Sequence, residues 1–413
     1  IFTAFRQVHR ATRHKRGSAF RCHVECRLDP RPSEHWRCCE TRAAPLPRVF
    51  LILGLTILVA CSPRGQIVLA PQAARVGEVH HIFIGTTRDT DADGSFGSGR
   101  SEQVRFARLD VSVPPKRKAG EINWPPRGAK PDPQRHFLTT AQDLYPQAEG
   151  FRAALGAELA ASGGEAVIFV HGYNNNFSEG VYRIAQLAHD LELPGAVLSY
   201  SWPSAAQPLG YVYDRDSALF ARDGLESLIA EVSAAGATRI LLVAHSMGAG
   251  LTMEAMRQAS IRDGGRAVER LAGVILISPD IDVDVFRGQA HSMRKLPQPF
   301  IIFGSNRDRV LRASALLTGQ AERLGSLSDV SRLADLDLTF FDVSEFNLGM
   351  GHFTAGDSPA LLQLLGRITD IDAALERDRV SRIGLVSGVV LTVQNATEVI
   401  LYPVARIATE VRR

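Results

Sequence analysis

Cysteine is absent from residues 62–413, so most of this sequence has no disulfide framework available to it. The five cysteines all lie near the N-terminus, at Cys22, Cys26, Cys38, Cys39 and Cys61. A domain without disulfides takes its stability from a hydrophobic core. The 413 residues are 45% hydrophobic and 22% charged, which is enough for one large α/β domain or two smaller ones.

A basic surface is also missing from most of the chain. The formal net charge is +3, but residues 1–60 alone carry eleven Lys and Arg against four Asp and Glu. The remaining residues therefore hold 36 basic and 40 acidic side chains. Because no basic patch interleaved with aromatic residues occurs among them, we predict no nucleic-acid partner.

The apolar run at residues 49–61 is too short to cross a membrane as a helix. Its 13 residues, at about 1.5 Å each, fall short of a hydrocarbon core of roughly 30 Å, so it is typical of a signal peptide. The run follows Arg48, and its end, "LVAC" at 58–61, resembles the lipobox of bacterial lipoproteins. That resemblance implies a signal peptide at 46–60 and acylation of Cys61, which would anchor the protein to the periplasmic face of the outer membrane. The alternative is a buried segment with an incidental cysteine.

Methionine is absent before Met247, and the printed sequence begins with isoleucine. Because residues 1–45 have no place before a signal peptide, we interpret them as a non-native or disordered extension, with the true start near Leu46 or Val49. The alternative is a zinc-binding tract, since several Cys and His residues there are metal-ligand types. Their spacing matches no known zinc finger, so we predict no metal site and no cofactor.

From residue 79 onward, apolar β-branched runs alternate with helical patterns, which predicts a mostly parallel, eight-stranded sheet with helices on both faces. The expected strands are 79–86, 104–113, 166–170, 196–201, 239–244, 273–278, 299–303 and 337–343. The first two alternate in polarity and suit an antiparallel edge. The expected helices are 178–191, with Ser178 as N-cap, 216–235 and 247–262.

These elements define the expected domain organisation. Residues 61–78 form a linker, 79–375 the α/β domain and 376–413 a C-terminal extension. The apolar stretch of that extension is interrupted by Gln394, Asn395 and Glu398, so we interpret it as a packed extra element rather than a membrane span.

Ser246 lies between an apolar strand and a helical pattern, in "LLVAHSMGAG" at 241–250. A serine at a sharp strand-to-helix turn is the nucleophile elbow of α/β-hydrolases, and the turn needs small residues two before and two after the serine. Ala244 and Gly248 are both small. The short pattern is weak by itself, but its place between strand and helix is the context that the motif requires. We therefore predict that Ser246 is a nucleophile.

The oxyanion hole is predicted at the end of an earlier strand, in "IFVHGYNNNF" at 168–177. In α/β-hydrolases one backbone donor comes from this position, which is the N–H of Tyr173 here, and the second is the N–H of the residue after the nucleophile, Met247. We interpret His171 and His245 as structural neighbours of the two turns.

The general base is expected late in the chain, because α/β-hydrolases order their triad as Ser, Asp or Glu, then His. Only two histidines follow the elbow, His291 and His352. His352 lies in the Gly-flanked loop "NLGMGHFTAG" after the last expected strand, whereas His291 has no strand or turn context. We therefore predict His352 as the base.

Two places offer the acid. Asp308 follows the seventh expected strand, in "IIFGSNRDRV", and this is the usual location. Asp280 and Asp282 follow the sixth strand, a position that some hydrolases use. We prefer Asp308 and keep Asp280 as the alternative.

Five segments together resemble a bacterial α/β-hydrolase family of unknown function, within the esterase/lipase superfamily, over about residues 79–375. They are "VHGYNNNF", "YSWPS" at 200–204, "YVYDRDSA" at 211–218, "LLVAHSMGAG" and "SPDID" at 278–282. The resemblance implies the fold and a serine-hydrolase site, and it implies no particular substrate.

The leading functional hypothesis is a serine hydrolase that cleaves carboxylic esters or thioesters through a Ser246 acyl-enzyme. Its partners would be a small-molecule acyl ester and, through the lipid anchor, a membrane. The alternative is a lipid-anchored envelope protein that keeps the fold as a catalytically inactive scaffold, since fold does not dictate function. The oligomeric state is not predicted.

Overall fold

The structure is a computed structural model that describes residues 64–319, 322–346, 352, 356, 358, 362, 386–393 and 396–403. The chain divides into two units, Ile1–Cys61 and Ser62–Arg413, and the first unit lies outside the described residues. The predictions of an N-terminal extension, a signal peptide and an acylated Cys61 therefore fall outside them as well. No helix in the described ranges is long and apolar enough to cross a membrane.

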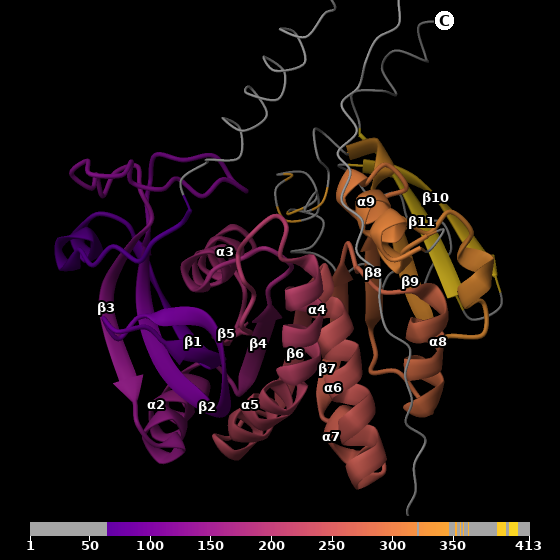
Figure 1. Cartoon of the computed structure of the whole chain (residues 1–413), viewed down its shortest axis with the longest axis horizontal. Coiled ribbons are helices and arrows are strands. Elements are labelled where there is room, and N and C mark those ends of the chain that lie inside the picture. The colour runs from indigo at the N-terminus through magenta and orange to yellow at the C-terminus, as the bar shows by residue number, and fades with distance from the viewer. Residues whose placement is uncertain are drawn as a thin grey trace, which may run out of the picture. The chain divides into compact units, whose positions relative to one another are not determined.

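A mixed sheet of eleven strands forms the centre of the second unit, in the order β10-β11-β9-β8-β7-β6-β4-β5-β1-β2-β3. Figure 1 shows it from β3 at one edge to the yellow hairpin at the other. In chain order the strands are β1 Glu78–Thr90, β2 Phe96–Val113, β3 Leu138–Tyr145, β4 Glu165–Val170, β5 Ala196–Ser201, β6 Arg239–His245, β7 Leu271–Ile277, β8 Phe300–Gly304, β9 Leu338–Asp342, β10 Val386–Val393 and β11 Ala396–Pro403. In the sheet, the eight strands from β11 to β1 (β11, β9, β8, β7, β6, β4, β5 and β1) all pair in parallel with their neighbours in this series. The pairs at the two edges, β1 with β2, β2 with β3 and β10 with β11, are antiparallel.

All eight expected strands occur, and the structure has three strands that were not expected, β3, β10 and β11. β3 was missed because its sequence, LTTAQDLY, is largely polar and its second half is exposed at the sheet edge. The hairpin of β10 and β11 lies in the stretch expected to be an extra packed element, and β11 continues the sheet by pairing in parallel with β9. The sheet edge predicted to be antiparallel is formed by β1, β2 and β3, although β1 also pairs in parallel with β5.

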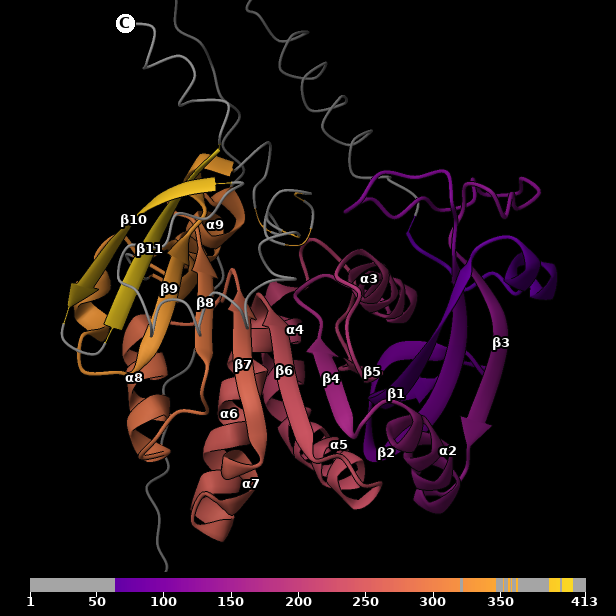
Figure 2. The same cartoon turned by 180° about the vertical axis from the view of Figure 1, so that it is seen from behind.

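Helices cover both faces of the sheet, as Figures 1 and 2 show from opposite sides. They are α2 Ala148–Ala161, α3 Phe177–Asp190, α4 Tyr211–Phe220, α5 Arg222–Ala234, α6 Met247–Asp263, α7 Arg266–Glu269, α8 Val283–Ser292 and α9 Arg309–Leu317, with short 3-10 turns η1 Pro71–Arg75, η2 Leu324–Ser326, η3 Val330–Leu333 and η4 Ser344–Phe346. Side chains of β4 alternate between two cores: Ile168 and Val170 pack with α2, α5 and α6, whereas Val167 and Phe169 pack with α3. Because both faces are covered, the strand is apolar on nearly every residue.

Two helix predictions need correction. The segment expected as one helix, 216–235, is divided at Ala221 into α4 and α5, where the hydroxyl of Tyr200 donates a 2.6 Å hydrogen bond to the Ala221 carbonyl. The N-cap of α3 is Asn176 rather than Ser178. Its side chain accepts from the N–H of Glu179, and the Glu179 carboxylate accepts from the N–H of Asn176, which forms a capping box.

Candidate active site

Ser246 lies in a strained turn between β6 and α6. Its φ of 54° and ψ of −123° are unusual for a residue with a side chain, and the residue is 1% exposed. The turn is tied down by its backbone: the Ser246 N–H donates to the Ile277 carbonyl at 3.0 Å, and the Ser246 carbonyl accepts from the N–H of Asp280 at 3.1 Å. This is the geometry of a nucleophile elbow.

The elbow requires the small residue at position 248. A Cβ placed on Gly248 would lie 2.3 Å from the carbonyl oxygen of His171, which belongs to the loop after β4. That oxygen is backbone and cannot move aside as a flexible side chain can. Ala244 is fully buried in β6, between β4 and β7.

Gly248→Ala is expected to lower the free energy of unfolding by about 1–3 kcal/mol, because the methyl group overpacks a site closed by backbone. Gly250→Ala is the matched control on the same helix: its Cβ would meet only Ile281 Cγ1 at 3.6 Å, an ordinary contact. The control should be neutral or stabilising by up to about 1 kcal/mol, since alanine favours a helix interior. Urea denaturation of both variants measures the difference, and equal stability of the two would contradict this account of the elbow.

His352 connects Ser246 to Asp308. Its Nε2 lies 2.7 Å from Ser246 Oγ, and its Nδ1 lies 2.9 Å from Asp308 Oδ2. An ionised carboxylate only accepts hydrogen bonds, so Nδ1 donates to Asp308, and Nε2 of the singly protonated ring accepts from the serine hydroxyl. The three groups thus form one hydrogen-bonded chain across segments that follow β6, β8 and β9.

Asp308 is held rigidly in place. It is the N-cap of α9 and is completely buried, and its Oδ1 accepts from the N–H groups of Val310 and Leu311 at 2.9 and 3.0 Å. The cap occupies one carboxylate oxygen and leaves Oδ2 to face His352. A second contact holds the backbone of His352, since Nε2 of His245 donates to the His352 carbonyl oxygen at 3.1 Å.

The other candidates from the sequence have different partners. Asp280 forms a buried ion pair with Arg323 at 2.8 Å and also accepts from Tyr211 and Ser314. Asp282 caps α8 through the N–H groups at the start of that helix. His291 is exposed and pairs with Asp335 at 2.8 Å. Among the described residues, the structure therefore brings Asp308 and His352 to Ser246.

The loop after β4 lies directly against the elbow. A Cβ on Gly172 would be 2.9 Å from Cβ of Ser246, so only glycine allows this approach. The residue after Gly172 is Tyr173, whose hydroxyl donates to the Pro208 carbonyl at 2.5 Å. Within the described ranges, no hydrogen-bond acceptor is recorded for the backbone N–H of Tyr173 or of Met247.

A family model for an alpha/beta hydrolase of unknown function (DUF900) matches residues 147–367, more than half of the chain. The chain belongs to this family. The match confirms the predicted α/β-hydrolase fold, a mostly parallel sheet flanked by helices, and the family resemblance. No curated protein matches the DUF900 chain.

Solved structures similar to this DUF900 protein are remote in sequence. A putative YdeN-like hydrolase from Pectobacterium atrosepticum is 19% identical with a TM-score of 0.32, and the alignment covers 53% of this chain and 98% of that one. An esterase from Pyrococcus furiosus is 11% identical with a TM-score of 0.31, covering 76% and 96%. Lipase B from Aspergillus fumigatus is 15% identical with a TM-score of 0.27, covering 40% of this chain and 43% of its own.

A buried arginine that the sequence analysis missed organises the loops of the DUF900 site. Arg88 is 1% exposed, and its guanidinium donates to Ser201 Oγ and to the carbonyls of Gly97, Asn175 and Ser204, while its Nη2 also lies 3.4 Å from Nε2 of His171. Burial lowers the pKa of Arg88 to about 10, so it remains charged at neutral pH. It joins β1 to the loops that follow β4 and β5.

His171 is a fixed part of this buried network. Burial, with a smaller effect of the nearby Arg88 charge, lowers the pKa of His171 to about 3. The neutral ring stacks on Trp202 with ring centroids 4.9 Å apart, and its Nδ1 and Nε2 lie 2.9 and 3.1 Å from the carbonyl oxygens of Gly172 and Trp202. Its contacts therefore shape the loop beside Ser246.

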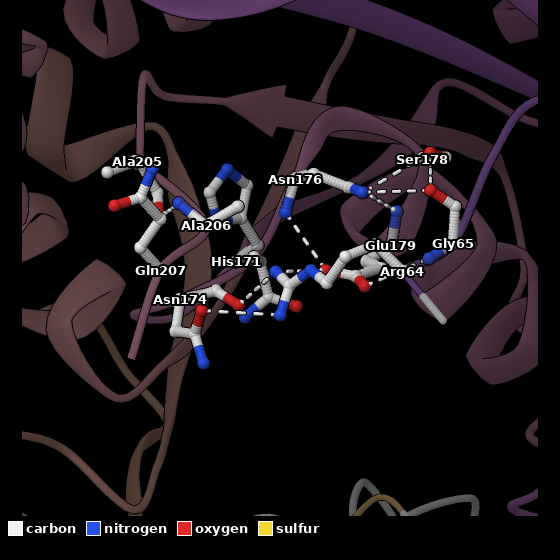
Figure 3. Close-up of polar contacts among 12 residues, drawn as sticks. Arg64, Gly65, His171, Asn174, Asn176, Ser178, Glu179, Ala205, Ala206 and Gln207 are labelled. Atoms are coloured by element: carbon white, nitrogen blue, oxygen red, sulfur yellow. Dashed lines mark hydrogen bonds and ion pairs between the residues drawn. The ribbon is translucent and has the colours of Figure 1, made fainter. Parts of the chain in front are cut away.

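Asp214, from the "YVYDRDSA" segment, is the second residue whose role was not predicted. It is fully buried and accepts from Ser204 Oγ and from the N–H groups of Asn174 and Ala205, at 2.6, 3.1 and 2.6 Å. Figure 3 shows Arg64 beside the same loop, where it donates to the Asn174 carbonyl and to the carboxylate of Glu179 in the first turn of α3. The family-specific segments thus position the loop that carries Tyr173.

Proposed function

We propose that this protein is a serine hydrolase that cleaves carboxylic esters or thioesters through an acyl-enzyme on Ser246. The observation that carries the proposal is the continuous hydrogen-bonded chain from Ser246 Oγ through His352 to Asp308. A serine hydroxyl becomes an effective nucleophile when an adjacent base takes its proton and a third group orients that base. Family membership supports the broader assignment as a hydrolase.

In the first half of the reaction, Ser246 Oγ attacks the acyl carbon while His352 Nε2 takes the hydroxyl proton. The bond to the alcohol or thiol then breaks, and His352 gives the proton to that leaving group. In the second half, His352 takes a proton from water, hydroxide attacks the acyl-enzyme, and the proton returns to Ser246 as the acid leaves. Atoms and protons balance without a cofactor.

The negative charge that develops on the acyl oxygen needs donors, and the N–H groups of Tyr173 and Met247 are the proposed ones. Both belong to backbone held close to Ser246, and neither has a competing acceptor within the described ranges. Loss of one such donor typically raises the barrier by about 3 kcal/mol. Asp308 keeps His352 in the tautomer whose Nε2 accepts and stabilises the ring when it becomes charged.

The strained elbow favours an enzyme over the catalytically inactive scaffold. Ser246 combines a φ of 54° with a ψ of −123°, outside the left-handed helical region, and strain of this kind costs about 1–3 kcal/mol and clusters at active sites. A scaffold has no requirement for a hydroxyl at that position or for a histidine within 2.7 Å of it.

A serine-reactive fluorophosphonate probe tests the proposal directly. The native protein should become labelled at Ser246, and Ser246→Ala should not be labelled. Ser260→Ala is the matched control, because Ser260 is a buried serine on the same helix whose hydroxyl has no partner among the described residues. Equal labelling of the native protein and Ser246→Ala, or no labelling of either, would support the scaffold instead.

A further inference from the structure

Three side chains of metal-ligand type meet far from Ser246: Glu78, His80 and His189. One possible ligand atom from each lies within 4.8 Å of the other two. His80 and His189 are separated by 109 residues in the chain, so no sequence motif joins them. The residue spacing in the sequence therefore gave no sign of this cluster.

The fold places the cluster by simple geometry. Glu78 and His80 are two residues apart on β1, so their side chains leave the same face of the strand. His189 lies in the last turn of α3, which packs over that face. Asn176, at the other end of α3, belongs to the loop beside the elbow, about 20 Å away along 14 helical residues. The cluster and Ser246 are therefore separate sites.

The distances in the cluster are close to the ligand spacing of a tetrahedral site. His80 Nε2 lies 3.3 Å from His189 Nδ1, and the two rings each lie 3.3 Å from a different oxygen of Glu78, His80 Nε2 from Oε1 and His189 Nδ1 from Oε2. Ligands at about 2.0–2.1 Å from a tetrahedral Zn²⁺ are about 3.3 Å apart. The Glu78 side chain is 64% exposed, so its carboxylate can rotate to present either or both oxygens.

The surroundings are compatible with a cation. Arg117, a basic side chain whose charge acts on His80, is already neutralised by a buried ion pair with Asp190, in which the Arg117 and Asp190 side chains are 5% and 3% exposed. The C-terminal end of α3 carries the negative end of the helix dipole.

We propose that Glu78, His80 and His189 bind one Zn²⁺ ion that ties the start of β1 to the end of α3. Two imidazole nitrogens and one carboxylate make a set typical of zinc, with a water molecule in the fourth position. The ion would cross-link the strand where the sheet changes from parallel to antiparallel pairing.

The test is a zinc count on the full chain, stripped of metal with a chelator, reloaded with Zn²⁺ and dialysed. The native protein should retain one more zinc per chain than Glu78→Gln or His189→Gln. Loss of a ligand should weaken this binding by more than about 100-fold, because even outer partners of metal ligands contribute about 10- to 100-fold. The Glu78 side chain is exposed, so Glu78→Gln should fold normally, and its zinc count still tests the proposal if His189→Gln folds poorly.

His81→Gln is the matched control, since His81 is the next residue on β1, faces the other way and pairs with Asp110 at 2.7 Å. It should retain the zinc and the rise of a few degrees in Tm that zinc gives to the native protein. Cysteine thiolates also bind zinc, and this chain has five cysteines near the N-terminus, so Co²⁺ is used as a second probe. The difference between the spectra of Co²⁺-loaded native and His189→Gln proteins should lack a thiolate charge-transfer band. Equal zinc counts and equal Tm shifts in native, Glu78→Gln and His189→Gln proteins would overturn the proposal and leave a metal-free hydrogen-bonded cluster.

Discussion

Ser246→Ala and His352→Ala are each expected to lower kcat/KM for an acyl ester by about 10⁶-fold, and the double variant should lose no more than either single variant. The reason is that the serine hydroxyl and its base act as one unit. His352 Nε2 lies 2.7 Å from Ser246 Oγ, and neither group has a use in acyl transfer without the other. Steady-state kinetics on a panel of esters and thioesters of different chain length measures the effect.

Two substitutions elsewhere serve as controls for this experiment. Ser260→Ala removes a buried hydroxyl from α6, and His291→Ala removes an exposed histidine that pairs with Asp335. Both should keep kcat/KM near the native value. If His291→Ala lost activity while His352→Ala kept it, the base would be misassigned. Additive losses in the double variant would mean that Ser246 and His352 act independently, contrary to the proposed mechanism.

Asp308→Asn is expected to lower kcat by about 10⁴-fold while the protein stays folded. The asparagine carbonyl can still accept from the N–H groups of Val310 and Leu311, so the N-cap of α9 is retained. Its amide, however, donates to Nδ1 of His352. That bond favours the tautomer with the proton on Nε2, which cannot accept the proton of Ser246.

Asp280→Asn is the matched substitution at the alternative acid, and its expected effect is on stability. It leaves the buried charge of Arg323 without its ion-pair partner, which typically costs about 3–5 kcal/mol. The kcat of the folded fraction should remain near the native value. Steady-state kinetics and urea denaturation of both variants separate the two roles. If Asp280→Asn lowered kcat by about 10⁴-fold while Asp308→Asn stayed active, Asp280 would be the acid.

Much of the fold could be predicted because the signals are local. Strands β4 to β9 are short apolar runs buried on both faces, and the turn at Ser246 follows such a run and precedes a helix. β3 could not be recognised in the same way, because half of its residues are polar and the residues of its second half are mostly exposed. At Ala221, where the expected helix is divided, the carbonyl also accepts from the hydroxyl of Tyr200, a residue of another strand.

The site was predicted only as far as residue types and chain order allow. Strand order and the α/β-hydrolase pattern indicated Ser246, His352 and two possible acids, and their catalytic roles remain predictions. The choice between Asp308 and Asp280 depends on which carboxylate faces His352, and this follows from the packing of α9 and the presence of Arg323. The buried roles of Arg88 and Asp214 were missed for the same reason.

Hydrophobic periodicity and turn chemistry act between residues close in the chain, so the sequence indicated most of the strands and helices, the order in which they alternate and the sharp turn that carries Ser246. Which side chains meet depends on how these elements pack. Ser246 and His352 are 106 residues apart, Arg88 and Ser204 are 116 apart, and His80 and His189 are 109 apart. Such contacts form only when the parallel strands align their ends and the helices pack over them, so they depend on the whole sheet and not on any one segment.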